Sequence, residues 1–159
     1  MYFYKIAGAL LLIVSAVAGS FLMNSIVSKR LAQTDAIIAF FRFIKAQIEC
    51  FSLPATEIII RCDKRLHDEC GLYYSSPPNN LPELFEAFEI KDSRVYDIVS
   101  RFAESFGRGY RDEQIKECDY YISLLCDRRQ EMAAELPKKK KLNSTMCISS
   151  ALFAVILLL

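Results

Sequence analysis

The chain has no tryptophan and a single histidine, His67, among its 159 residues. It also lacks a glycine-rich phosphate loop, a Cys-x-x-Cys pair and a His-x3-His pair. His67 and Cys70 are three residues apart, with Cys62 and Asp68 nearby. A closed zinc site needs four ligands at defined spacing, and a catalytic histidine needs an orienting partner. The pattern therefore favours packed cysteines and a solvated histidine, and we expect no enzyme, metal or cofactor.

A strong net charge is also absent, because 20 basic residues balance 19 acidic ones to give +1. The longest basic run is nevertheless four consecutive lysines, which follow Pro137. No other basic face extends this run, so a nucleic-acid partner is not expected. Nothing in the sequence points to a small-molecule substrate either.

Ionisable side chains are missing from two apolar runs, Ile6–Val27 and Leu142–Leu159. Each run is about as long as a membrane-spanning helix, which needs roughly 20 residues. Positive charge concentrates on the cytoplasmic side of a span, and here it lies on the inner flank of both runs. We therefore predict a membrane helix at 1–28, a cytoplasmic domain at 29–141 and a second membrane helix at 142–159. The predicted membrane-boundary residues are Lys29, Arg30, Lys138, Lys139, Lys140 and Lys141.

A cleaved secretory signal is the alternative for the N-terminus, because Ala16 to Ser20 has the small-x-small pattern of a cleavage site. Cleavage would place the middle segment outside the cell. Two observations favour an anchor: apolar residues resume at Phe21, and Lys29 and Arg30 then follow. Five of the six cysteines lie in the middle segment, and this odd number favours free thiols over disulfides.

Apolar residues recur at spacings of three and four through the middle segment, which predicts amphipathic helices. We expect a helix that continues from the first span through Ile37 to Phe51, with Ile37, Phe41, Ile44, Ile48 and Phe51 on its buried face. Further helices are expected after Ser52, around Leu81 to Phe88, from Ser93 to Phe106, and from Asp112 into the second span.

Local signals mark the ends of these helices. Ser52 and Ser93 are the expected N-caps, and Gly71–Asn80 has the composition of a loop. Gly107 and Gly109 are expected to permit a left-handed C-cap and a tight turn. Pro137 is expected to kink the last helix or to mark a joint before the lysines.

The sequence shows no strand-like alternation, so the predicted fold is all-α. The two spans must share one bilayer. We therefore expect the first and last helices to pair antiparallel, with the shorter helices packed across them as a cytoplasmic bundle.

The order of the segments resembles the stage III sporulation protein AB family along the whole chain. The more specific matches are Ala46, Ile48 and Pro54 before the loop, and Phe102, Phe106, Gly107, Asp112 and Gln114 after it. The chain departs from the family pattern at Gln47, where a carboxylate is usual, and at Phe106, where leucine is usual. In the last span it has Ser149, Ser150 and Ala151 where the family has glycines, and serine and alanine partly preserve a close helix contact.

This resemblance implies a domain similar to the cytoplasmic domain of the inner-membrane platform protein of type II secretion and type IV pilus systems. It also implies a non-enzymatic scaffold in the mother-cell membrane facing the forespore, within a secretion-like channel complex needed for endospore formation. The implied partners are other channel proteins, a cytoplasmic secretion-type ATPase and the lipid bilayer. A generic membrane-tethered adaptor outside sporulation is the alternative. The predicted partner-binding residues are Arg108, Arg111, Asp112, Gln114 and Lys116.

Overall fold

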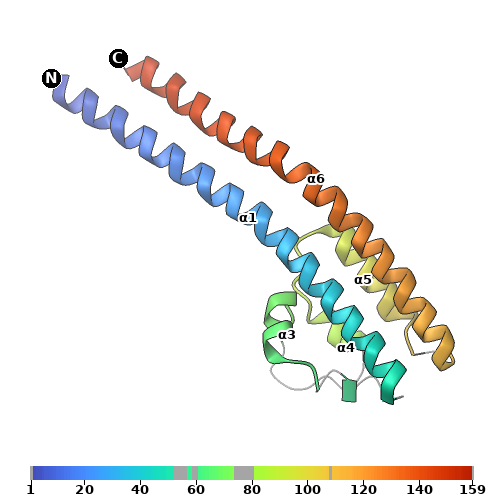
Figure 1. Cartoon of the computed structure of the whole chain (residues 1–159). Helices are drawn as coiled ribbons and strands as arrows, with labels where there is room; N and C mark the ends of the chain where they lie inside the picture. The colour runs from blue at the N-terminus through green and yellow to red at the C-terminus, as the bar shows by residue number, and fades with distance from the viewer. Residues whose placement is uncertain (1, 52–56, 59–60, 74–80, 108, 159) are drawn as a thin grey trace. The chain divides into compact units, whose positions relative to one another are not determined.

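The computed structural model describes residues 2–51, 57–58, 61–73, 81–107 and 109–158, without the side chains at 2–7, 9–13, 51, 81, 82, 86, 157 and 158. Its helices are α1 (Tyr2–Phe51), α3 (Lys64–Cys70), α4 (Leu81–Glu86), α5 (Ser93–Ser105) and α6 (Arg111–Leu158) (Figure 1). Over these residues no strand forms, and the only strand-like pairing is an isolated antiparallel bridge between Leu72 and Phe88. The predicted all-α class is confirmed.

The chain forms two compact units, Arg30–Glu131 and the two end segments Met1–Lys29 and Met132–Leu159. We call the first the helical unit and the second the end-segment unit. Both α1 and α6 contribute residues to both units. Pro137 lies inside α6, which continues through it to Leu158.

The core of the helical unit is built on the second half of α1. The Phe41 ring lies 4.3 Å from the Phe102 ring of α5 and 6.5 Å from the Phe85 ring of α4. On α6, Cys118 and Leu125 complete the buried cluster. The predicted apolar stripes are buried as expected at Ile37, Phe41, Ile44, Ile48, Leu84, Phe85, Phe88, Val95, Val99, Phe102 and Phe106, of which Phe88 and Phe106 follow the ends of α4 and α5. Phe51, Leu81 and the predicted cap Ser52 lie outside the side chains or residues that the structure describes.

α1 is buried over a wider arc than its apolar stripe predicts. Phe40 is not among the five residues predicted for that stripe, although it is three residues from Ile37 and four from Ile44, and it is fully buried. Its ring lies 6.0 Å from the His67 ring of α3 and 5.9 Å from the Phe88 ring. α3 therefore covers a second side of α1, and most of the circumference of α1 is buried between Thr34 and Ile48.

Gln33 on α1 fastens two connecting segments to this helix. Its Nε2 donates to the carbonyl oxygens of Cys70 at 2.9 Å and Glu89 at 2.7 Å, and its Oε1 accepts from the Lys91 amide at 3.3 Å. Gly71 sits in this contact with φ +82°, where a Cβ atom would lie 3.0 Å from the Glu89 carbonyl oxygen. Glycine is therefore required at position 71 both by its backbone angle and by the space around it.

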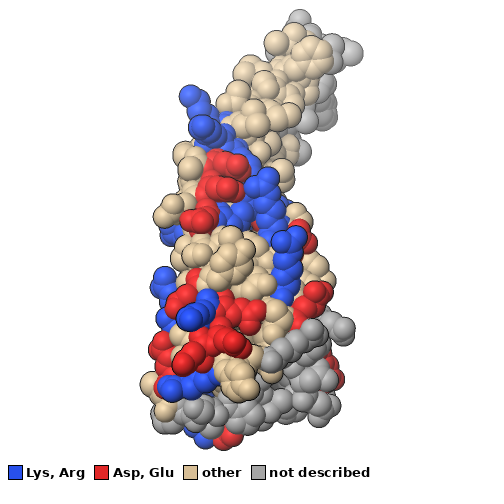
Figure 2. Space-filling model, turned by 90° about the vertical axis from the view of Figure 1, so that its right-hand side faces the viewer, with Lys and Arg blue, Asp and Glu red and all other residues tan. Residues whose placement is uncertain are grey.

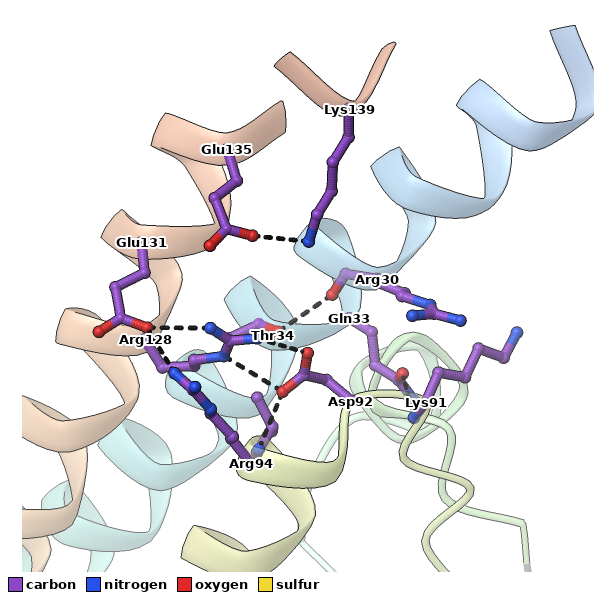
Figure 3. A network of polar contacts seen from close by, with 11 residues as sticks. Arg30, Gln33, Thr34, Lys91, Asp92, Arg94, Arg128, Glu131, Glu135 and Lys139 are labelled. Carbon is purple, nitrogen blue, oxygen red and sulfur yellow. Dashed lines mark hydrogen bonds and ion pairs between the residues drawn. The ribbon is translucent and has the colours of Figure 1, made fainter. Parts of the chain in front are cut away.

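A polar network joins the start of α5 to α6 (Figure 3). Asp92 is the N-cap of α5, since its carboxylate accepts from the Val95 amide. The predicted cap, Ser93, is instead the first helical residue. Arg128 of α6 donates to both Asp92 oxygens, at 3.2 and 2.8 Å, and both side chains are largely buried. Glu131 in turn pairs with Arg128 and with Arg94.

Burial and hydrogen bonding have opposite effects on the pKa of Asp92. Burial opposes the charged carboxylate, but the hydrogen bonds from Arg128 and Val95 outweigh it and lower the pKa below its ordinary value. A lowered pKa on folding means that the folded state holds its proton less tightly. The contribution of Asp92 to stability is therefore full above about pH 4 and is lost as the pH falls through the lowered pKa.

The end-segment unit pairs the first part of α1 with the last part of α6. Ser20 Oγ lies 2.9 Å from Ser144 Oγ, and Asn24 Nδ2 donates to the same oxygen at 3.4 Å. Small residues of both helices, among them Gly19 and Ala151, line a groove of about 360 Å³. Gly19 precedes Ser20 on α1, whereas Ala151 follows Ser144 on α6. The two segments therefore run antiparallel, as expected for the first and last helices.

Among the residues whose side chains are described, no helical stretch is both long enough and apolar enough to cross a membrane. The runs Ile6–Val27 and Leu142–Leu159 extend beyond that set, at residues 6, 7, 9–13 and 157–159. The two predicted membrane helices are thus not confirmed.

Comparing two N-caps tests the network. Asp92→Ala removes a cap and leaves Arg128 without its main partner, so it should lower the free energy of unfolding by about 3 kcal/mol. Asp63→Ala removes only the cap of α3, where Asp63 accepts from the Arg65 amide at 3.0 Å, and should cost about 1 kcal/mol. Denaturant unfolding of the full chain in a nonionic detergent, followed by circular dichroism, measures both. Equal losses for the two variants would contradict a stabilising role for the Asp92–Arg128 pair.

Candidate docking surface at the start of α6

A tight turn connects α5 to α6. α5 ends at Ser105, and the Phe106 amide donates to the Phe102 carbonyl oxygen at 2.9 Å. Gly107 adopts φ +85°, the left-handed angle predicted for it. Gly109 does not adopt a positive φ, so the expectation that both glycines use the left-handed region is wrong for Gly109. A Cβ atom at position 109 would lie 2.8 Å from Glu113 Oε2, so the Glu113 side chain would have to shift.

Tyr110 is the residue immediately before the first turn of α6. Its amide donates to Glu113 Oε2 at 3.0 Å, and its carbonyl oxygen accepts from the amides of Glu113 and Gln114. A glutamate that accepts from the N-cap amide is one half of a capping box. The Tyr110 side chain supplies no cap and is 85% exposed. Its backbone is fixed while its ring lies in water.

Arg111, one of the predicted partner-binding residues, makes contacts within the chain. Its Nε donates to the Ile48 carbonyl oxygen at 3.1 Å, and its Nη2 donates to the Glu49 carbonyl oxygen. These carbonyl groups belong to the last turn of α1, which has no helical partners for them. The positive charge also suits the negative end of the helix dipole. Arg111 therefore ties the start of α6 to the end of α1.

The other predicted partner-binding residues differ in their availability. Gln114 donates through Nε2 to the Gly109 carbonyl oxygen at 2.8 Å, so it closes the turn. Asp112 and Lys116 are exposed, and within the described part of the chain neither forms an ion pair. Arg108 lies outside the described residues. A docking role for this set stays a prediction, and Asp112 and Lys116 are its accessible charged members.

A second row of side chains lies along the same end of α6. Tyr110, Glu113, Glu117 and Tyr120 follow one another at spacings of three, four and three, which places them on one side of the helix. We call this set the tyrosine–glutamate stripe. Tyr120 is 58% exposed, and its ring packs edge-on against Tyr121, which in turn contacts the buried Phe102 ring at 5.4 Å. Apolar periodicity does not identify Tyr110 or Tyr120, because neither belongs to a buried face.

The helical unit has an acidic surface. Between Arg30 and Glu131 the sequence has eighteen acidic residues and fourteen basic ones. Figure 2 shows acidic side chains gathered over the lower part of one face, with basic side chains between them. The basic residues of the chain are therefore in excess only in the end segments.

His67, Cys62, Cys70 and Cys118 are buried in the helical unit. His67 is 6% exposed, so the expectation that it is solvated is wrong; α3 turns its ring onto Phe40. Burial lowers the pKa of His67, and burial raises the pKa of Cys62 to about 11 and of Cys70 to about 12. Over the described residues, no three His, Cys, Asp or Glu side chains are placed to hold a metal ion. All six cysteines are free thiols.

The predicted membrane-boundary residues are mostly exposed. Lys29, Arg30, Lys138, Lys139 and Lys141 are exposed, whereas Lys140 is half-buried. Lys139 pairs with Glu135 one turn earlier at 2.6 Å. In the end-segment unit, Lys29 follows Asn24 along α1 and the lysines precede Ser144 on α6, so the antiparallel pairing places them at the same end.

Over the described residues, the structure defines an all-helical protein with a helical unit whose first and last helices extend into a second unit. The chain belongs to the stage III sporulation protein AB family, whose model matches residues 5–159. The resemblance found in the sequence is thus confirmed, and a role in sporulation follows from it. No curated protein and no solved structure is detectably similar to the chain.

Comparing substitutions of Arg111 and Lys116 should show whether Arg111 has a structural role. Arg111→Met removes the hydrogen bonds to the end of α1 and should lower the melting temperature by about 5 °C. Lys116→Met changes an exposed side chain and should shift it by less than about 2 °C. Thermal melting of the full chain in nonionic detergent, followed by circular dichroism, makes the comparison. If both variants have the melting temperature of the wild type, Arg111 does not hold α1 to α6.

Proposed function

We propose that this protein is a non-enzymatic scaffold of the secretion-like complex between mother cell and forespore. In this proposal its helical unit lies in the mother-cell cytoplasm and docks a cytoplasmic secretion-type ATPase, while its end segments lie in the membrane and contact other channel proteins. Membership of the sporulation family over residues 5–159 is the observation that supports the cellular setting. The resemblance to the platform protein of type II secretion and type IV pilus systems supports the choice of the ATPase as the partner, by an analogy of fold and layout.

The membrane part of the proposal is supported by the sequence of the two ends. Ile6–Val27 and Leu142–Leu159 contain no ionisable side chain, and basic residues follow the first run and precede the second. Each lysine near an anionic leaflet contributes about 1 kcal/mol of attraction to the membrane surface. Lysines that flank a span also oppose translocation of their segment across the membrane. The run Lys138–Lys141 would therefore act as a stop that keeps the helical unit on the cytoplasmic side.

The docking part is supported by what the start of α6 leaves exposed. Asp112 and Lys116 project charge from a helix whose first turn is fixed by Glu113 and Arg111. A charged surface on a rigid element gives specificity and a fast encounter more than raw affinity. Such a surface suits a partner that must be found and released repeatedly, as an ATPase would be.

Charge reversal tests the docking. In sporulating cells, the tagged wild-type chain should co-purify with the ATPase of the same complex, and Asp112→Lys with Lys116→Glu should reduce recovery by about fivefold. Both residues are exposed, so circular dichroism of the variant should match the wild type. Asp68→Lys with Lys64→Glu, on α3, is the matched control. Recovery of the ATPase unchanged by the α6 variant would exclude this surface, and failure to recover it with the wild type would exclude the proposed partner.

Cysteine accessibility tests the topology. Cys50 is exposed, whereas Cys62 and Cys70 are buried, so Cys50 is the correct reporter. A membrane-impermeant maleimide should leave Cys50 unlabelled in intact cells and label it after permeabilisation. Cys70 should react only after denaturation, because burial keeps its thiol protonated. Labelling of Cys50 in intact cells would instead favour an exported domain after signal cleavage.

A further inference from the structure

We infer that the tyrosine–glutamate stripe of α6 binds an arginine-containing basic segment of a partner protein. The inference rests on the proposed function, since it specifies the chemistry of a partner for a docking domain. It concerns residues beside, and distinct from, the exposed pair Asp112 and Lys116.

Tyr110 is not explained by the fold. The position before the first turn of a helix favours Ser, Thr, Asp or Asn, because their side chains accept from the free amides there. Tyrosine cannot do so, and at 85% exposure it adds nothing to the core. Glu113 and the turn at Gly109 nevertheless hold its backbone in one place. An aromatic side chain that breaks a local rule without a gain in folding points to a use outside the chain.

Tyr120 supplies a second aromatic contact with an equally fixed position. Its ring lies 5.2 Å from the Tyr121 ring, and Tyr121 packs on the buried Phe102. Tyrosine gives a large contact area at low entropy cost, and exposed rigid tyrosines are frequent in binding sites. The stripe thus presents an aromatic ring at each end.

The charge between the two rings selects a cationic occupant. Within the described part of the chain, Glu117 forms no ion pair, and the ordered contact of Glu113 is to the Tyr110 amide. The nearest cation along the chain on one side, Arg111, already binds the end of α1. Lys116 lies three residues after Glu113, close to the same side of the helix, but within the described part of the chain it forms no ion pair with either carboxylate. Neither Glu113 nor Glu117 therefore has an ion-pair partner there, and their charges favour an external positive group over an acidic segment or a nucleic acid.

Arginine fits this surface better than lysine. Its planar guanidinium can pair with a carboxylate through two hydrogen bonds and can also stack on an aromatic face. Carboxylates flanked by tyrosine rings offer both contacts along one helix side. A lysine ammonium would gain the charge attraction but little of the stacking. The expected partner segment therefore has arginines spaced along one face.

Peptide binding to the full chain tests this inference. The chain is placed in nanodiscs of neutral lipid, and fluorescence anisotropy follows three labelled helical peptides of equal length that have arginine, lysine or glutamate at the same positions. We expect the arginine peptide to bind about tenfold more tightly than the lysine peptide, and the glutamate peptide not to bind. Binding of the arginine peptide should weaken as salt is added.

Two sets of variants separate charge from aromatic contact. Glu113→Gln with Glu117→Gln removes both charges while glutamine keeps an acceptor for the Tyr110 amide, and it should weaken arginine-peptide binding by about tenfold. Tyr110→Ser installs a better N-cap, so the chain should melt no lower than the wild type. The same variant should reduce the preference for arginine over lysine. A variant that is as stable and binds less well cannot be explained by misfolding.

The control removes two charges elsewhere, by Asp68→Asn with Glu89→Gln, and should leave binding within about twofold. The inference is overturned if this control weakens binding as much as the stripe variant, if the glutamate peptide binds, or if Tyr110→Ser keeps the full arginine preference. The ATPase experiment distinguishes failure of this inference from failure of the proposed function. Peptide binding at the stripe without recovery of the ATPase would overturn only the proposed partner. Recovery of the ATPase that is unaffected by Glu113→Gln with Glu117→Gln would overturn the stripe as its docking site.

Discussion

The helical unit depends on the burial of α1 between Thr34 and Ile48. A helix with one apolar face needs one neighbour, but this stretch is buried over most of its circumference and needs several. Phe40 faces α3 and Phe41 faces α4 and α5, so two consecutive residues bind different parts of the chain to one helix. Burying a phenylalanine gains about 2 to 3 kcal/mol, and aromatic pairs add to this. The short helices α3 and α4 are too brief to be stable alone, and this surface is what orders them.

Polar contacts then fix the positions that apolar packing leaves adjustable. Gln33 and Arg111 both bind backbone carbonyl groups, and both act at the ends of segments that packing alone would not align. Asp92 caps α5 and also neutralises Arg128, so one carboxylate fixes the start of α5 against α6. Because α6 is held at its first turn by Arg111 and further along by Asp92, its exposed side chains are presented by a rigid element.

The sequence predicts the apolar part of this structure well and the polar part poorly. Spacings of three and four identify the buried faces of α1, α4 and α5, because those faces result from helix geometry alone. Phe40, three residues after Ile37 and four before Ile44, also fits this spacing. The burial of His67, in contrast, could not be predicted in this way, since it depends on where α3 packs. Asp92 and Ser93 are equally good N-caps by local preference, and only Asp92 also contacts Arg128, 36 residues away in the chain. Likewise, the charge of Arg111 suggests a binding residue, and only the position of the end of α1 shows a structural one.

The start of α6 shows why charge alone is a poor guide to a binding surface. Arg111 and Gln114 belong to the set that family resemblance and charge single out, yet both contact backbone carbonyl groups of this chain. Tyr110 is not in that set, although it occupies a position where tyrosine gains nothing for the helix and stays exposed. A side chain whose contacts are satisfied internally is constrained by the fold, whereas one that the fold does not need is free to meet a partner. The exposed tyrosines and the carboxylates between them are therefore better evidence of an interface than the more conspicuous arginine.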